Sequence, residues 1–146
     1  MKEKVAIVTG SATGVGAATA VILAQKGCNV VINYTRSKEE AMATAQLVEQ
    51  HNVESLVFQA DVSNDDDCQS MVEATIKKWG KIDYLVNNAG KTKFNPFENL
   101  EGLSSEDFLD IYSVNVVGPY QMIKAVVPYM KKQGGGAIVN DSSLAG

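Results

Sequence analysis

The sequence has little histidine, cysteine or surplus positive charge, and each shortage excludes a class of function. A single histidine, His51, excludes metal sites built from several histidines and argues against a Ser-His-Asp triad. The two cysteines, Cys28 and Cys68, have no metal-binding spacing and form no disulfide framework, so we expect a reducing, cytoplasmic compartment. Because 13 Lys and Arg face 17 Asp and Glu, we expect no nucleic-acid partner.

Long apolar runs are also absent from the chain. No run reaches the length needed to cross a membrane, and the first apolar segment is too short for a signal peptide, so we expect no membrane partner. Hydrophobic residues nevertheless make up 45% of the 146 residues, which is enough to bury a core and exclude a disordered chain. Length and composition therefore predict a single domain over residues 1–146.

Short β-branched segments alternate with longer helical segments along the chain. Five segments are apolar nearly throughout, too short for a buried helix and bounded by Gly, Asn or Asp, which predicts strands at 5–8, 30–32, 55–58, 82–86 and 137–139. Nearly continuous apolar strands are typical of a parallel sheet that is covered on both faces. With right-handed crossovers, the prediction is an α/β fold with a doubly wound, Rossmann-like parallel sheet, truncated after the fifth strand.

Three of the predicted helices carry a start signal, in which a serine is followed three residues later by an acid. The serine hydroxyl is predicted to cap the helix in each case, at Ser37, Ser63 and Ser104. The last of these helices is expected to run from about Ser104 to Lys132. Because Pro119 and Pro128 lie inside it, we expect proline to remove a hydrogen bond and kink it.

The first predicted strand runs into a glycine-rich turn, and an alanine-rich helix follows. The spacing G-x-x-x-G-x-G lets the backbone turn sharply and lets a pyrophosphate approach the helix N-terminus. No lysine follows the last glycine, which excludes the phosphate loop of kinases and NTPases. Between a strand and a helix, the pattern favours dinucleotide binding over a simple tight turn. The predicted cofactor-binding residues of the turn are Gly10, Ser11, Thr13, Gly14, Val15 and Gly16.

The end of the second predicted strand bears on the choice of cofactor. An acid at this place would bind the ribose 2′-hydroxyl and select NAD, but the nearest acid is Glu39, inside the next helix. The loop instead offers Tyr34, Thr35, Arg36 and Ser37, of which the last three could hold a 2′-phosphate. We therefore predict NADP as cofactor, with NAD as the alternative. The other interpretation of Arg36 is a solvated surface cation.

With these motifs, the chain resembles the short-chain dehydrogenase/reductase family over its whole length. Five stretches carry the resemblance in the family's order: the glycine turn, Asp61-Val62 after the third strand, Asn87-Asn88-Ala89-Gly90 after the fourth, Asn115 in the long helix, and Ser143 in an S-x-x-G stretch after the fifth. The stretch Asn33-Tyr34-x-Arg36-Ser37 looks most like the 3-oxoacyl carrier-protein reductase and glucose dehydrogenase-like branches.

The resemblance implies cofactor contacts for several of these positions. Asp61 and Val62 would contact the adenine ring. Asn88 would brace the sheet beside the glycine turn, while Ala89 and Gly90 would leave room for the nicotinamide ribose.

The resemblance also implies the reaction. Ser143 would hydrogen-bond the substrate carbonyl and stabilise charge on its oxygen, and Asn115 would hold a water in a proton relay. The reaction would transfer a hydride between NADP(H) or NAD(H) and a small carbonyl or secondary alcohol, in a homo-oligomer, tetrameric or dimeric. From the residues alone, Asn115 is equally a polar residue on a helix face, and Ser143 is more often a cap or turn residue.

The family's general acid, the tyrosine of a Y-x-x-x-K motif beyond the serine, has no counterpart in these residues. Two pairs have the Y-x-x-x-K spacing but precede Ser143, and we interpret them as chance matches: Tyr34 with Lys38, and Tyr120 with Lys124. We favour a longer enzyme whose activity needs a Tyr/Lys pair beyond Gly146, because a half sheet leaves an apolar edge exposed. The alternative is a catalytically inactive nucleotide-binding fragment or a partner subunit.

Two further groups of residues have a simpler explanation than function. Three consecutive acids at 65–67 suggest a metal site, but their position at a helix start explains them better, and we predict no metal. Phe94, Phe97 and Tyr112 could line a substrate cleft, although core packing is the more common role of such residues.

Overall fold

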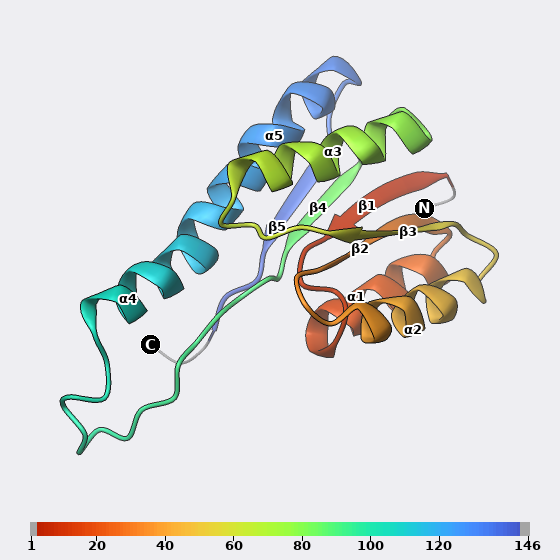
Figure 1. Ribbon diagram of the computed structural model, residues 1–146. Helices are drawn as coiled ribbons and strands as arrows, with labels where there is room; N and C mark the ends of the chain where they lie inside the picture. Colours follow the sequence, from red (N-terminus) through yellow and green to blue (C-terminus); the bar gives the residue numbers. More distant parts are fainter. Residues whose placement is uncertain (1–2, 144–146) are drawn as a thin grey trace.

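The computed structural model describes residues 3–143, which form a five-stranded parallel sheet with helices on both faces (Figure 1). The strands are β1 (Lys4–Val8), β2 (Cys28–Tyr34), β3 (Ser55–Gln59), β4 (Tyr84–Asn87) and β5 (Ala137–Asn140), in the order β3-β2-β1-β4-β5. The chain winds outward from β1 in one direction and then from β4 in the other. This confirms the predicted doubly wound sheet and puts its switch point between β1 and β4.

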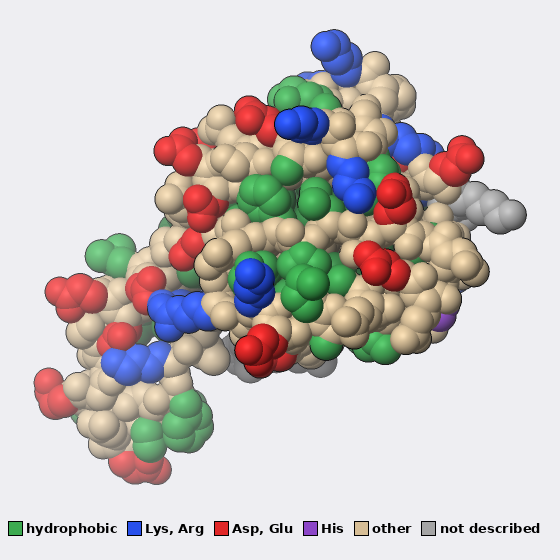
Figure 2. All heavy atoms as spheres, turned by 45° about the vertical axis from the view of Figure 1, so that its right-hand side comes forward, with side chains coloured by type: hydrophobic (Ala, Val, Ile, Leu, Met, Phe, Trp, Pro, Cys, Tyr) green, Lys and Arg blue, Asp and Glu red, His purple; other side chains and the backbone are tan. Residues whose placement is uncertain are grey.

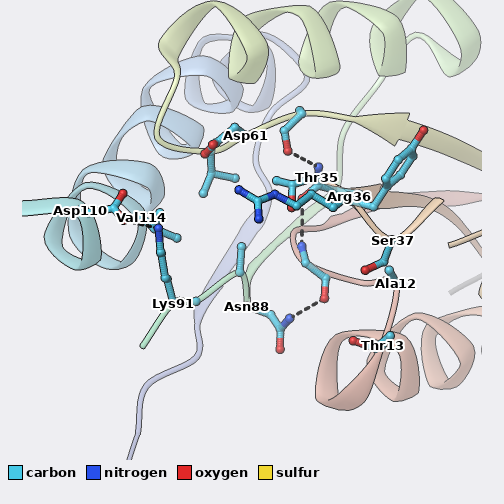
Figure 3. Close-up of a pocket in the computed structure, with 17 residues that line it drawn as sticks. Ala12, Thr13, Thr35, Arg36, Ser37, Asp61, Asn88, Lys91, Asp110 and Val114 are labelled. Atoms are coloured by element: carbon cyan, nitrogen blue, oxygen red, sulfur yellow. Dashed lines mark hydrogen bonds and ion pairs between the residues drawn. The ribbon is translucent and has the colours of Figure 1, made fainter. Parts of the chain in front are cut away.

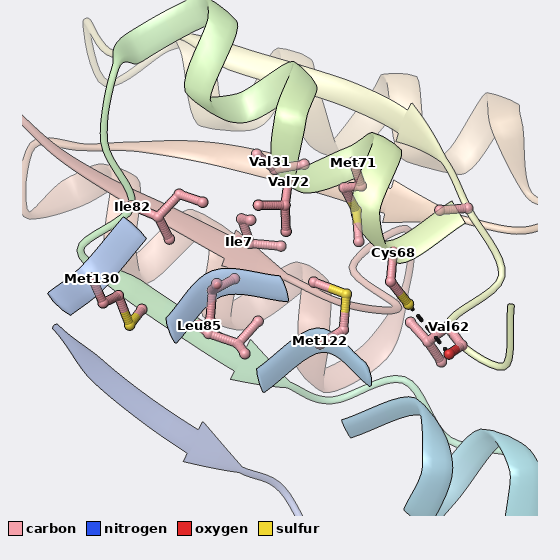
Figure 4. Packing of buried hydrophobic residues seen from close by; sticks show 12 residues of the cluster. Ile7, Val31, Val62, Cys68, Met71, Val72, Ile82, Leu85, Met122 and Met130 are labelled. Carbon is pink, nitrogen blue, oxygen red and sulfur yellow. Dashed lines mark hydrogen bonds between the residues drawn. The ribbon is translucent and has the colours of Figure 1, made fainter. Parts of the chain in front are cut away.

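Two pairs of helices cover the two faces of the sheet. Helices α1 (Gly14–Gln25) and α2 (Lys38–Glu49) lie on one face, and α3 (Asp65–Trp79) and α5 (Gly118–Lys132) lie on the other (Figure 1). Side chains of a strand alternate between faces, so β1 sends Ile7 to the α3/α5 side and Val8 to the α1/α2 side. Figure 4 shows the first of these cores, in which Leu85 and Met122 pack beside Ile7. The buried strands β1 and β2 therefore support the loops at the carboxyl edge of the sheet.

The long helix predicted from Ser104 to Lys132 is divided by a change of register, which corrects the expectation of one kinked α-helix. It consists of α4 (Ser105–Tyr112), a π-helical turn η1 (Ser113–Val117) and α5. In the π-turn, the backbone N–H of Gly118 donates to the carbonyl of Ser113, five residues back. The next residue, Pro119, has no N–H to continue the α-helical register, and it falls in the first turn of α5, where proline is tolerated.

Only one of the three predicted serine caps forms as expected. The hydroxyl of Ser104 accepts a hydrogen bond from the N–H of Asp107, whose carboxylate accepts the Ser104 N–H, which makes a capping box. Ser37 occupies the cap position of α2, but its side chain makes no capping bond. The cap of α3 is Asn64 and not Ser63, because Ser63 hydrogen-bonds the carboxylate of Asp61 instead.

The aromatic residues that were expected to pack in the core are exposed, which is a second correction. Phe94 and Phe97 are 90% and 98% exposed, and Tyr112 is 58% exposed. The two phenylalanines lie on the loop between β4 and α4, which extends beyond the sheet (Figure 1), and Figure 2 shows hydrophobic side chains gathered at this projecting end. Among residues 3–143, no helix has the length and apolarity needed to cross a membrane.

Candidate functional site

A cleft of about 470 Å³ opens at the carboxyl edge of the sheet, beside the switch point (Figure 3). It brings together residues from four separate loops. The predicted cofactor-binding residues that line it are Gly10, Thr13, Tyr34, Thr35, Arg36, Asp61, Val62, Asn88, Ala89 and Gly90. Parallel strands place the loops that follow them at one edge, so residues more than 70 positions apart in the sequence come to share one cleft.

The glycine turn packs closely against the turn that follows β4. A Cβ atom added to Gly10, whose φ is +62°, would lie 2.8 Å from the Cα atom of Ala89. One added to Gly16 would lie 2.5 Å from the side-chain nitrogen of Asn88. Neighbouring atoms therefore exclude a side chain at both positions, and at Gly10 the positive φ also disfavours one.

Gly14 differs, because a Cβ atom there would meet no other atom within 4 Å. Its φ is +60°, and it begins α1. The cap residue Thr13 makes no side-chain hydrogen bond to the helix, and the first turn contains no acid. The N-terminus of α1 therefore combines uncapped N–H groups, the positive end of the helix dipole and open space in front of them. This arrangement fits an anionic group such as a pyrophosphate.

Thr9 and Asn88 join the two turns on either side of the switch point. The Thr9 hydroxyl accepts hydrogen bonds of 3.0 Å from the N–H groups of Asn88 and Ala89. In return, the Asn88 side-chain amide donates to the carbonyls of Thr9, at 2.9 Å, and Gly10, at 3.1 Å. The glycine turn is thus held by four hydrogen bonds across the switch point before any ligand arrives.

The structure does not bring every predicted cofactor-binding side chain to the cleft. Ser11 is fully buried, and its hydroxyl donates to the carbonyl of Val8 at 2.6 Å and accepts from the N–H of Asn33 at 2.9 Å. Ser11 thus holds the turn from inside the protein. Val15 is largely exposed on the first turn of α1, next to Gly16.

The turn after β2 presents a cation to the cleft. Arg36 extends its guanidinium group into the cleft (Figure 3), and it forms no ion pair with any acid in the part of the chain that is described. The side-chain amide of Gln59 donates to the carbonyl of Thr35 at 2.9 Å and so supports this turn. On the neighbouring loop, one oxygen of the Asp61 carboxylate accepts hydrogen bonds from the N–H and the hydroxyl of Ser63, and Asp61 forms no ion pair with Arg36. Arg36 is therefore available for an anion.

Asn115, predicted to be catalytic, lies in the π-turn and binds the chain directly after Gly90. Its amide oxygen accepts from the N–H of Lys91 at 2.7 Å, and its amide nitrogen donates to the carbonyl of Lys91 at 2.9 Å. The Lys91 ammonium pairs with Asp110 on α4. The π-turn thus positions the loop at the end of the cleft, which is a common use of such turns near functional sites.

Ser143, the other predicted catalytic residue, is exposed and follows β5. The N–H of Asp141 donates to the carbonyl of Asn87 at 2.9 Å, so the chain after β5 starts beside the chain after β4. The remaining residues of the predicted S-x-x-G stretch, 144–146, lie outside the described residues.

Other reactive groups lie away from the cleft. The Lys124 ammonium, from one of the chance Y-x-x-x-K matches, pairs with Asp65 at 2.7 Å between α3 and α5. Burial raises the pKa of Cys28 and of Cys68 to about 12, so both free thiols stay protonated. Within residues 3–143, no group of three or more His, Cys, Asp or Glu side chains is placed to hold a metal ion.

Comparison with known proteins identifies the family. The sequence model of the short chain dehydrogenase family matches residues 4–146. This chain belongs to the short-chain dehydrogenase family. It is 37% identical over 144 residues to a 3-oxoacyl-(acyl-carrier-protein) reductase of Staphylococcus epidermidis, covering 99% of this chain and 58% of that protein. It is 41% identical over 143 residues to an uncharacterized oxidoreductase of Thermotoga maritima, covering 98% and 55%.

A solved dehydrogenase structure has the same fold over this chain. The crystal structure of NAD+-bound xylitol dehydrogenase superposes with a TM-score of 0.90 at 33% identity, covering 99% of this chain and 55% of that protein. This short-chain dehydrogenase sequence therefore spans little more than half the length of the relatives it matches. The resemblance and the Rossmann-like fold predicted from the sequence are both confirmed.

Three polar residues that line the short-chain dehydrogenase cleft escaped the sequence analysis as site residues: Asn33, Lys91 and Asp110. Asn33 was an available signal, since it is a polar residue that directly follows the apolar segment 30–32. The Lys91–Asp110 pair had no sequence signal, because the two residues belong to different elements and their spacing carries no pattern.

Proposed function

We propose that the protein is an oxidoreductase that transfers a hydride between a nicotinamide dinucleotide, with NADP(H) preferred over NAD(H), and a small carbonyl or secondary alcohol. The observation that carries the proposal is the cleft at the switch point, which is lined by Thr13, the residue before the uncapped first turn of α1, and a Cβ atom at the next residue, Gly14, would meet open space. Membership in the short-chain dehydrogenase family supports the same reaction class. The nicotinamide ring supplies or accepts the hydride when it is bound.

The lining residues suggest where each part of the dinucleotide would bind. The pyrophosphate would lie at the glycine turn, on the N–H groups of Gly14, Val15 and Gly16. The adenine would lie beside Asp61 and Val62 on the loop after β3. The nicotinamide ribose would lie along Ala89 and Gly90, where the absence of large side chains leaves room.

Arg36 carries the proposed preference for NADP(H). Its guanidinium has no acidic partner among residues 3–143, and the neighbouring Thr35 and Ser37 also line the cleft. A 2′-phosphate would supply the missing anion, and a planar guanidinium suits it. No acid from the end of β2 is present to favour a free 2′-hydroxyl.

The catalytic part of the proposal involves Ser143 and Asn115. Ser143 would donate a hydrogen bond to the substrate oxygen, and Asn115 would hold a water for proton transfer. The side-chain amide of Asn115 already accepts one hydrogen bond from the backbone of Lys91 and donates one to it, so a water would use the amide's second N–H or second lone pair. Activity would also need a Tyr/Lys pair beyond Gly146.

We further propose a homo-oligomer, a dimer or tetramer, that uses the helix formed by α4, η1 and α5. Phe108, Tyr112, Val116 and Tyr120 recur every four residues along this helix and are all exposed. Such a ridge fits the groove of a second helix. Sedimentation should show an oligomer that Tyr112→Glu dissociates, whereas a monomeric wild-type protein would contradict this part of the proposal.

Isothermal titration calorimetry with NADPH and NADH tests the proposed cofactor. Arg36→Ala should weaken NADPH binding by about tenfold to a hundredfold, the usual range for a lost charged hydrogen bond, and leave NADH binding unchanged. Lys38→Ala is the matched control, since it removes a nearby positive charge from the start of α2 that does not line the cleft. Equal effects of the two substitutions on NADPH would refute the role of Arg36.

Turnover separates the proposed enzyme from a binding module. With a panel of small ketones, NADPH oxidation by the full-length protein should be abolished by Ser143→Ala while NADPH affinity is kept. Cofactor binding without turnover of any carbonyl would instead favour the inactive nucleotide-binding module. Failure to bind either coenzyme would overturn the proposed function.

A further inference from the structure

Asn33, the sixth of the seven residues of β2, is a buried polar residue near the carboxyl end of this inner strand, with 2% of its surface exposed. Its side-chain oxygen accepts a hydrogen bond of 2.9 Å from the N–H of Gly10. Its side-chain nitrogen donates to the carbonyl of Ala60 at 3.0 Å, with a longer contact of 3.5 Å to the carbonyl of Phe58. One planar amide thus joins the turn after β1 to the end of β3.

The backbone of Asn33 strengthens the same connection. Its N–H donates to the hydroxyl of Ser11 at 2.9 Å, and its carbonyl accepts from the N–H of Ser11 at 3.0 Å. The glycine turn is therefore held from the β2 side by three hydrogen bonds to one residue. Thr9 and Asn88 hold the same turn from the β4 side.

The two ends that Asn33 joins belong to different parts of the proposed cofactor site. Gly10 opens the turn that would hold the pyrophosphate, and Ala60 directly precedes Asp61, which would lie beside the adenine. An amide is suited to this place because it offers an acceptor and a donor on one rigid group. An ionised carboxylate offers only acceptors, and an alanine offers neither.

We infer that Asn33 is a positioning residue for the dinucleotide, fixing the pyrophosphate turn and the adenine loop at one separation through its side-chain amide. The inference rests on the proposed function. Asn33 acts on a part of the site that NADPH and NADH share, so its loss should weaken both coenzymes by the same factor. This distinguishes Asn33 from Arg36, whose loss should affect NADPH alone.

The test substitution is Asn33→Asp, which changes almost nothing in size. The new carboxylate still presents one oxygen to the N–H of Gly10, but its second oxygen faces the carbonyls of Ala60 and Phe58 and repels them. By calorimetry, we expect the dissociation constants of NADPH and NADH to rise together by about tenfold or more, with their ratio unchanged.

Asn29→Asp provides the matched control on the same strand. Asn29 is the second residue of β2, and its side-chain oxygen accepts from the N–H of Glu54 at 2.9 Å, at the opposite edge of the sheet. Like Asn33, Asn29 joins β2 to the chain of β3, here at the residue directly before that strand, but it does not line the cleft. We expect its coenzyme dissociation constants to stay within about twofold of wild type, and urea denaturation reports the stability of both variants.

Hydrogen exchange on the unmodified protein gives a test that does not depend on whether a variant folds. Because the Gly10 N–H donates to the buried side chain of Asn33, its exchange without coenzyme should be slowed to a degree similar to that of β1. Rapid exchange of the Gly10 N–H beside slow exchange in β1 would overturn the inference.

The remaining outcomes of the binding experiment separate a failure of the positioning role from a failure of the proposed function. Unchanged affinity of Asn33→Asp for both coenzymes, a loss confined to NADPH, or an equal loss in Asn29→Asp would each overturn the positioning role while the proposed function stands. A wild-type protein that binds neither coenzyme would overturn the proposed function itself.

Discussion

Replacing Gly16 with alanine tests whether the glycine turn packs against the turn after β4 as closely as the structure shows. The added Cβ atom would lie 2.5 Å from the side-chain nitrogen of Asn88, 2.5 Å from the carbonyl oxygen of Gly10 and 2.9 Å from the Cα atom of Ser11. Two of these neighbours are backbone atoms, which cannot rotate away. The turn must therefore move as a whole, against the four hydrogen bonds of Thr9 and Asn88.

The size of the effect follows from these contacts. Overpacking of a buried site costs about 1–3 kcal/mol, so we expect Gly16→Ala to lower the free energy of unfolding by about 2 kcal/mol. For a chain of this length, that corresponds to a fall in Tm of roughly 4–8 °C. Coenzyme binding should weaken as well, because the carbonyl of Gly10 and the amide of Asn88 are displaced from the cleft lining.

Gly134→Ala is the control for this substitution. Gly134 follows α5, has a φ of +93°, and has no atom within 4 Å of an added Cβ. Its substitution should cost about 1 kcal/mol through the left-handed backbone alone and leave coenzyme binding unchanged. Urea denaturation followed by circular dichroism, together with calorimetry, measures both effects. A Gly16→Ala protein with wild-type stability and coenzyme affinity would refute the close packing of the two turns.

Three further predictions concern stability and reactivity. Ser104→Ala should destabilise the protein by about 1 kcal/mol in urea denaturation, whereas Ser37→Ala should have a much smaller effect, because only the Ser104 hydroxyl makes a capping bond. Cys28 and Cys68, with pKa values raised to about 12 by burial, should react with a thiol reagent only after unfolding, and fast labelling of the native protein would contradict their burial. The hydrogen bond from Lys93 lowers the pKa of Asp107 below its ordinary value of 3.8. The stability lost in Asp107→Asn should therefore be constant at neutral pH and shrink as pH falls below about 4. A stability difference between wild type and Asp107→Asn that grows in acid would contradict this prediction.

The sequence was sufficient to predict the fold class and the edge of the sheet at which the candidate cleft lies. Strand identity follows from short apolar segments, and the side on which ligands bind follows from parallel strands, which place all the loops after them together. The glycine turn could be recognised because its residues are consecutive and its backbone needs are local. Gly10 and Gly14 both adopt the positive φ that favours glycine.

Where the sequence predictions failed, competing partners decided the outcome. Ser63 satisfies the cap pattern, but it bonds to Asp61 and leaves the cap of α3 to Asn64. Phe94 and Phe97 are apolar enough for a core, but the loop that carries them extends beyond the sheet, where no element covers them among the described residues. Apolarity predicts a tendency to be buried, and the path of the chain decides whether a neighbour is present.

By itself, the sequence determined the alternation of strands and helices and the position of the glycine turn, because these depend on residues that are close together in the chain. It also determined the family, because short motifs recur in the family's order along the chain. Only the tertiary structure decided that Asn33 joins two loops, that Ser11 faces inward, and that Asn115 holds the backbone of Lys91 through a π-helical turn. The physical reason is that these hydrogen bonds join segments of different elements. Their partners come within reach only after the parallel sheet has assembled and brought its carboxyl ends to one edge.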